Sequence, residues 1–297
     1  MKVKLISMTP NPIDVMWTAA RTCYSAKSPI EMWEAIYPQN IDLLDGYDNG
    51  EKEEIVNKHW NLVKKVLDSG HQSVAEHVYF TFAIEGISRA CSHQLVRHRA
   101  GIVFSQQSQR YVEIKEDVFN LLRLEEAKPV LDKYFTDVNT SNWQEYLECL
   151  KHYLHHIQMG TKAEDARAIL PNATKTNITM SVNFRELIHL CNLRLCTRAQ
   201  KEIRDLFKEI VKCVKEVDER LASYLVPSCE ALGVCTEHQS CHRKPTLKEV
   251  LESYKLLECD TGLSKDDWNL LMESIENPKV NKNLQDLMKM KSVIEEE

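Results

Sequence analysis

The spacing of apolar residues changes twice in the first third of the chain, and this constrains the fold more than any other sequence feature. From Lys52 to Leu67, apolar residues recur at the intervals of a helix with one buried face. From His77 to Glu85 they alternate with polar or small residues, which predicts a strand with one apolar face. Helical spacing returns from Ile87 to Arg99. A strand bordered by amphipathic helices predicts that the apolar face of a sheet packs on a helical layer.

The remainder of the chain is rich in helical patterns. The region Val130–Ile157 is interrupted near Asn139–Asn142, and another helix is expected from Glu164 until Pro171, since proline disfavours helix in the residue before it. One or two long helices are expected in Asn183–Leu225, and an asparagine that starts a helix usually caps it. We therefore predict one clear strand and the class α+β: a helix-rich core packed on an antiparallel sheet, with a helical C-terminal extension.

A short cationic segment stands out in an acidic chain. The segment Arg97–Tyr111, called the arginine strip below, combines arginines and a histidine with hydroxyl and amide side chains, whereas the formal net charge of the 297 residues is −6. Guanidinium groups beside hydroxyl and amide donors suit phosphate and other planar anions. Because nucleic-acid binding needs a broad basic face, the strip favours a small anionic ligand.

Three further arginines lie in the second half of the chain: Arg167, Arg185 and Arg194. Arg194 stands between two leucines in an apolar stretch, and a buried arginine needs a partner because an unpaired buried charge is costly. That partner could be an internal glutamate such as Glu186, or an anionic ligand. Together with the arginine strip, these arginines favour an anion site. Ser108 has no base among its immediate neighbours, which favours a ligand contact over a nucleophile.

Several common protein classes are disfavoured by composition. With eight glycines and no Gly-x-Gly-x-x-Gly motif, the chain is not expected to hold a dinucleotide on a Rossmann sheet. Its first residues contain no apolar run long enough for a signal peptide or membrane helix, which predicts a cytoplasmic protein. Its ten cysteines are scattered through helical patterns and are expected to be free thiols.

One candidate metal site lies between the first helix and the strand. His71, Glu76 and His77 lack the His-Glu-x-x-His spacing of a helical metal site, so a polar cap or a ligand contact is the preferred interpretation. Together with His98 they define an alternative function, a metal-dependent phosphohydrolase that acts on a nucleotide. A helical scaffold without enzymatic activity is the other alternative.

A second candidate metal site lies in the C-terminal part of the chain. Its closely spaced residues are Cys229, Cys235, His238, Cys241 and His242. Zinc binding is chemically feasible there, but the paired Cys-x-x-Cys spacing that makes such predictions strong is missing. We expect packed thiols without metal in this segment, and we assign no metal ligand elsewhere.

A series of motifs, spread over roughly Ala19 to Gln200, resembles the flavin-dependent thymidylate synthases. In chain order these motifs are Ala20–Tyr24, Gly70–His71, Glu76–His77, Gln94 before the triplet Arg97–Arg99, Ser108–Tyr111, Ala166–Pro171 and Asn192–Arg194. The chain departs from the family at one point: eight residues separate Arg99 from Ser108, where the family usually has seven.

The resemblance implies sites for FAD and for dUMP. The residues that it assigns to FAD are Ser73, Glu76, Arg97, His98, Arg99, Asn183, Arg185 and His189. The residues that it assigns to dUMP are Gln94, Gln106, Ser108, Arg110, Arg167 and Arg194. His71 would lie near the flavin where nicotinamide or folate approaches, so His71 and Arg194 are the implied catalytic residues.

The resemblance also implies the reaction and the assembly. The reaction is a reductive methylation of dUMP to dTMP, in which methylenetetrahydrofolate supplies the carbon unit and NADPH reduces FAD. The assembly is a homotetramer with active sites shared between subunits. Residues 1–226 are expected to form the catalytic domain. Residues 227–297 are expected to form a Cys/His segment and a helical extension, with short amphipathic helices around Leu247–Leu251 and Leu284–Met288.

Overall fold

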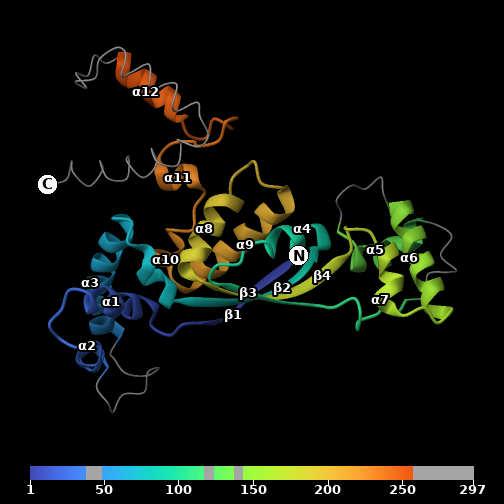
Figure 1. Ribbon diagram of the computed structural model, residues 1–297, viewed down its shortest axis with the longest axis horizontal. Helices are drawn as coiled ribbons and strands as arrows, with labels where there is room; N and C mark the ends of the chain where they lie inside the picture. The colour runs from blue at the N-terminus through green and yellow to red at the C-terminus, as the bar shows by residue number, and fades with distance from the viewer. Residues whose placement is uncertain (38–48, 117–123, 137–142, 257–297) are drawn as a thin grey trace. The chain divides into compact units, whose positions relative to one another are not determined.

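The computed structural model describes residues 1–37, 49–116, 124–136 and 143–256, which belong to two compact units (Figure 1). The sheet unit comprises Met1–Ser7, Phe80–Val182 and Gln200–Val217. The helical unit comprises Met8–Tyr79, Asn183–Ala199 and the chain from Asp218 onward. Each unit is therefore assembled from three separate stretches of sequence.

The sheet unit contains a four-stranded antiparallel sheet with the order β1-β2-β4-β3. Its strands are β1 (Lys2–Met8), β2 (Tyr79–Ser88), β3 (Ile102–Gln106) and β4 (Lys175–Asn183). The edge strand β3 pairs with β4 from Ile102 opposite Val182 to Gln106 opposite Ile178. The predicted α+β class with an antiparallel sheet is confirmed; the strand predicted from the sequence is β2, and β1, β3 and β4 were not identified.

Helices cover this sheet and form a second core beside it. The helix α4 (Arg89–Leu95) contacts α9 (Lys201–Val217), whose buried stripe is Ile203, Leu206, Phe207, Ile210 and Val214. The helices α5 (Leu124–Tyr134), α6 (Trp143–Gln158) and α7 (Ala163–Ala166), with the 3-10 helix η3 (Arg167–Ile169), are green in Figure 1. They enclose an apolar core with four aromatic residues, Phe135, Trp143, Tyr146 and Tyr153.

The helical unit contains helices from all three of its stretches of sequence. Its elements are α1 (Pro12–Thr22), α2 (Pro29–Ile36), α3 (Asn49–Asp68), the 3-10 helix η1 (Gln72–His77), α8 (Phe184–Arg194), α10 (Glu219–Ala222), α11 (Ser228–Leu232) and α12 (Leu247–Leu256). Buried Asp14 joins three of them, because it accepts hydrogen bonds from Tyr37 Oη at 2.5 Å and contacts His59 Nδ1 at 2.7 Å. Trp17 stacks on the His59 ring with centroids 4.1 Å apart.

The predicted helices differ from the observed ones mainly at their ends. The helix predicted at Lys52–Leu67 is α3, and Asn183 caps α8 as expected, accepting from the Glu186 N–H at 2.8 Å. The helix predicted at Ile87–Arg99 is shorter, because Ser88 caps α4 and the chain leaves the helix after Leu95.

Two other predictions need correction. The strand predicted to begin at His77 begins at Tyr79, because Glu76 and His77 belong to η1. The long helical region predicted from Asn183 divides into α8, α9 and α10. Of the C-terminal helices, Leu247–Leu251 opens α12, while Leu284–Met288 lies outside the described residues. Within the described ranges, no helix is long and apolar enough to span a membrane.

Candidate functional site

Arg89 and Arg167 form a concentrated positive site in the sheet unit. Arg89 is the first residue of α4, and its Nε and Nη2 both donate to Oε1 of Gln109, at 3.2 and 3.0 Å. Burial and, to a smaller extent, the charge of Arg167 lower the pKa of the Arg89 guanidinium. Since arginine keeps its charge in proteins, two like charges lie near one another in half-buried positions. A bound anion would relieve this repulsion.

Glu164 orients two arginines of this site. Its carboxylate pairs with Nε of Arg110 at 3.2 Å, and its backbone carbonyl accepts a hydrogen bond from Nε of Arg167 at 3.1 Å. Glu164 lies in α7 and Arg167 begins η3, so a single helical turn sets both contacts. Each contact uses Nε, while the guanidinium fork has further donors on its two terminal nitrogens.

Hydroxyl and amide side chains surround these arginines. Ser108 Oγ accepts from the Arg110 N–H at 3.2 Å, which closes a turn shortly after β3. Gln106 Nε2 donates to Ser92 Oγ at 2.9 Å and to Thr176 Oγ1 at 3.3 Å. Beside this network lies a pocket with about 480 Å³ of empty space, lined in part by Gln107, Ser108, Gln109, Tyr153, Lys175 and Thr176.

Residues at and just before the start of α9 hold α4 near both of its ends. The Glu202 carboxylate accepts hydrogen bonds from the Ser88 N–H at 2.7 Å and from Ser88 Oγ at 2.5 Å. Ser88 Oγ in turn accepts from the Cys91 N–H at 2.9 Å, as a helix cap does. Near the other end, Gln94 Nε2 donates to Oε1 of Gln200. These contacts fix the helix that presents Arg89 and Gln94.

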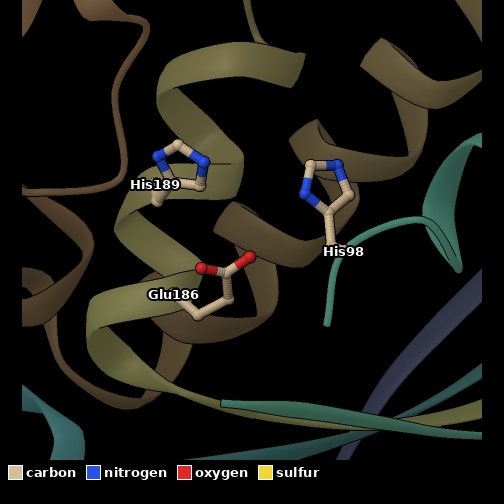
Figure 2. Close-up of side chains that lie close together, drawn as sticks. All are labelled: His98, Glu186 and His189. Atoms are coloured by element: carbon tan, nitrogen blue, oxygen red, sulfur yellow. The ribbon is translucent and has the colours of Figure 1, made fainter. Parts of the chain in front are cut away.

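The triplet Arg97–Arg99 lies between α4 and β3. Arg97 and Arg99 are exposed, whereas His98 is half-buried. Figure 2 shows His98 on the connecting segment, outside any helix or strand. Two exposed guanidinium groups separated by one residue can meet an anionic ligand without first losing buried contacts.

In the helical unit, four of the residues assigned to FAD lie on α8 or contact it: Glu76, Asn183, Arg185 and His189. Arg185 Nη1 forms an ion pair with Glu76 of η1, and both side chains are about half exposed. Asn183 is buried and caps the helix. Glu186 and His189 project from α8 one turn apart (Figure 2), and His189 is exposed. Burial raises the pKa of the Glu186 carboxyl, while His189 and Arg185 act to lower it.

Arg194 is the last residue of α8 and is half-buried, whereas its leucine neighbours had suggested a buried position. The reason is that one of these leucines, Leu193, is itself 44% exposed. A cation at a helix C-terminus is favoured by the helix dipole, so part of the role of Arg194 can be structural.

His71 and Ser73 lie at the beginning of η1 and are exposed. His71 is the residue that precedes the first turn of η1, without a side-chain cap bond. The carboxylate of Glu76, a candidate metal ligand together with His71, forms an ion pair with Arg185. Glu76 is therefore one half of a polar pair, and the contact of His71 with a ligand stays a prediction.

Arg89 is the functional candidate that the sequence analysis missed. It lies eight residues before the arginine strip, inside a pattern that was read only as helix. A signal was present, because the chain between Glu85 and Glu113 carries four arginines and no acidic residue. Extending the strip to the full acid-free segment would have included Arg89.

The chain is similar in sequence to a known protein family. Residues 4–218 match the family model described as "Thymidylate synthase complementing protein". A flavin-dependent thymidylate synthase of Geobacter sulfurreducens is 37% identical over 257 residues, which are 86% of this chain and 100% of that protein. One of Clostridium tetani is 38% identical over 268 residues, covering 84% of this chain and 96% of its own length.

A similar fold is found among solved structures. The flavin-dependent thymidylate synthase of Helicobacter pylori, solved in complex with FAD and dUMP, superposes with a TM-score of 0.57 at 25% sequence identity. The match covers 76% of this chain and 100% of that one.

Proposed function

The chain belongs to the family of flavin-dependent thymidylate synthases, FAD enzymes that convert dUMP to dTMP, and from this we propose which ligand each site residue binds. The observation that carries the proposal is the pair Arg89 and Arg167. Their like charges interact, Arg89 lies beside the amide of Gln109, and a bound anion would offset the repulsion. A nucleotide phosphate has that charge and geometry.

We assign the phosphate of dUMP to the sheet unit. Arg89, Arg167 and Ser108 would hold the phosphate oxygens, with Arg110 nearby on the same turn. Gln106 and Gln94 are assigned to the rest of the nucleotide. Each is held in place by a neighbouring hydroxyl or amide group. These contacts bind and orient the substrate before any chemical step.

Arg194 is assigned to the uracil ring of dUMP. As carbon–carbon bond formation proceeds, negative charge builds on the oxygens of the ring, and a guanidinium donor there stabilises the transition state more than the ground state. A half-buried position strengthens this interaction relative to full exposure, because water screens it less.

The residues of the chain also fit FAD. Arg97, Arg99 and Arg185 are cationic, exposed side chains of the kind that a diphosphate needs. Ser73, Glu76, His98, Asn183 and His189 complete the assigned set, in which the Glu76–Arg185 ion pair fixes one arginine in advance. When bound, FAD supplies the hydride chemistry of the reaction, which no side chain of the chain can supply.

Two co-substrates are part of the proposal. Methylenetetrahydrofolate would donate the one-carbon unit and NADPH the reducing equivalents. His71, exposed at the start of η1, would help to position whichever of them approaches the flavin.

The test is an assay of the purified protein together with its absorption spectrum. We expect flavin bands, and dTMP formation that requires dUMP, methylenetetrahydrofolate and NADPH. Release of inorganic phosphate from dUMP with a divalent metal and no flavin would support the phosphohydrolase instead. A colourless protein that binds neither FAD nor dUMP would support the scaffold.

We further propose that the enzyme is a homotetramer with shared active sites. Large apolar side chains are exposed on both units, among them Val103 at 65%, Tyr111 at 80% and Tyr24 at 83%. Such side chains are common at interfaces between subunits.

Subunit sharing predicts complementation between two inactive variants. If Arg97 and Arg194 reach one active site from different subunits, then Arg97→Ala and Arg194→Ala chains that are unfolded and refolded together should regain activity above that of either variant alone. The same mixture without refolding is the control. Failure of rescue, with tetramers formed normally, would mean that both residues come from one subunit.

A further inference from the structure

Four cysteines from distant parts of the sequence line one pocket of the helical unit. They are Cys196, Cys229, Cys235 and Cys241. Cys196 follows the end of α8, Cys229 lies in α11, and the other two lie on the segment that follows α11. Cys229 is close enough to Cys235 and Cys196 for their charges to interact. The sequence alone had grouped three of these residues with His238 and His242, neither of which lines the pocket.

The backbone brings these cysteines together through a sharp reversal. Gly233 ends α11 with φ 74°, a left-handed conformation that favours glycine and turns the chain back towards Cys235. The Cys235 N–H then donates to the carbonyl of Pro245 at 2.7 Å, and Cys235 pairs with Thr246 in an isolated parallel bridge. These contacts join Cys235 to Pro245 and Thr246, with Cys241 on the loop between them.

Apolar packing does not account for the order of this segment. Between Ser228 and Thr246, the buried apolar side chains are those of Val234 and Cys235 alone. The helix α11 has only five residues, and the segment that follows it is largely turns and bends. A loop-rich segment with a small core and several converging thiols is typical of structures that a metal ion stabilises.

The charges around the pocket suit a metal bound by thiolates. Four thiolates and one Zn²⁺ carry a net charge of −2, and binding releases the thiol protons to solvent. Arg198 and Arg243 also line the pocket, where their positive charges can offset this excess. Arg198 is oriented by Gln239 at 2.8 Å, and Arg243 by an ion pair with Glu230.

We propose that Cys196, Cys229, Cys235 and Cys241 bind one zinc ion, which ties the segment after α11 to the end of α8. No three of these sulfur atoms lie within 4.8 Å of one another in the described chain, so the thiols must turn towards a common centre on binding. The proposal replaces the expectation of packed thiols, because the structure adds a fourth cysteine that lies 33 residues before Cys229. It does not depend on the proposed reaction.

The first measurement is the metal content of the full-length protein, purified without chelators and analysed for zinc, iron and acid-labile sulfide. We expect about one zinc per chain and negligible iron. Zinc far below one per chain, or iron with sulfide in its place, would overturn the zinc assignment.

Serine variants then locate the metal. Loss of a side chain that only hydrogen-bonds to a metal ligand already weakens metal binding about 10- to 100-fold, so Cys241→Ser and Cys196→Ser should each lower the affinity for zinc by at least that factor. Cys241 is exposed, so its substitution is expected to disturb folding less than that of Cys196. Cys149→Ser, on α6, is the matched control and should keep its zinc. Unchanged zinc in both cluster variants would place the metal elsewhere and contradict the proposal.

Cobalt provides a readout that does not rely on any variant. After zinc removal, Co²⁺ alone should produce thiolate-to-metal charge-transfer bands and the visible bands of a tetrahedral site. Removal of the metal should also lower Tm, on the order of 5 °C, because the ion binds the folded state only. Absence of the cobalt bands in a folded protein would rule out a thiolate site.

Discussion

Arg89→Ala and Arg167→Ala are each expected to weaken dUMP binding on the order of tenfold to a hundredfold, with a matching loss of kcat/KM. Each substitution removes charge-assisted hydrogen bonds to the phosphate, and one such bond is worth about 1.5–3 kcal/mol. The double variant should lose less than the sum of the two, because both side chains act on one anion. Isothermal titration with dUMP and steady-state kinetics measure these effects.

The stability of the same variants separates binding from structure. Without nucleotide, Arg89→Ala removes one of two neighbouring like charges and should leave Tm unchanged or higher, although it also gives up the bonds to Gln109. Added dUMP should then stabilise the variant much less than the wild type. As a control, deoxyuridine lacks the phosphate and should bind variant and wild type equally. An unaltered affinity for dUMP in both single variants would contradict the assignment of the phosphate to this site.

Arg194→Ala is expected to lower dTMP formation on the order of tenfold to a hundredfold or more, while FAD content changes little. The lost interaction, about 1.5–3 kcal/mol, acts on charge that builds up on the uracil ring, so kcat should fall more than dUMP affinity. Reduction of the bound flavin by NADPH without dUMP should continue, because the flavin contacts are assigned to other residues. Turnover, bound flavin and Tm are measured on one preparation.

A structural role for Arg194 predicts a different pattern. Because Arg194 ends α8, it can stabilise the helix dipole or an internal ion pair. In that case the alanine variant should have a lower Tm, less bound FAD and less activity. Arg194→Lys should restore all three, because it keeps the charge. Under the substrate assignment, Arg194→Lys stays poorly active, since lysine lacks the planar fork of donors. A stable, flavin-bound and fully active lysine variant would contradict the assignment.

Much of the helical framework could be predicted from spacing alone, because α3, α6 and α9 each bury one continuous stripe. The strand β4 carried an equally readable alternation, with Thr176, Ile178, Met180 and Val182 buried in turn, and was overlooked. By contrast, β3 has only five residues, and its first three, Ile102–Phe104, are all apolar, so no alternation marks it as a strand.

The candidate site was predicted less completely than the fold. The residues with unusual local composition, such as the triplet Arg97–Arg99, were found from the sequence. Arg89 was not, because its significance comes from Arg167, which is 78 residues away in the chain and near it in space. A single sequence does not reveal such a long-range pairing of like charges.

The hydrogen bonds from Ser88, the capping residue of α4, to Glu202 have a consequence for how the protein is made. Ser88 and Glu202 are 114 residues apart, so a chain emerging from the ribosome contains Arg89 and the arginine strip long before α9 exists to hold them. The sheet unit likewise needs its third stretch, Gln200–Val217, to be complete. Native structure of such high contact order forms late, since distant segments must first meet. We therefore expect nascent chains that stop before α9 to have no affinity for the nucleotide, and the incomplete sheet unit to depend on chaperones until synthesis has passed Val217.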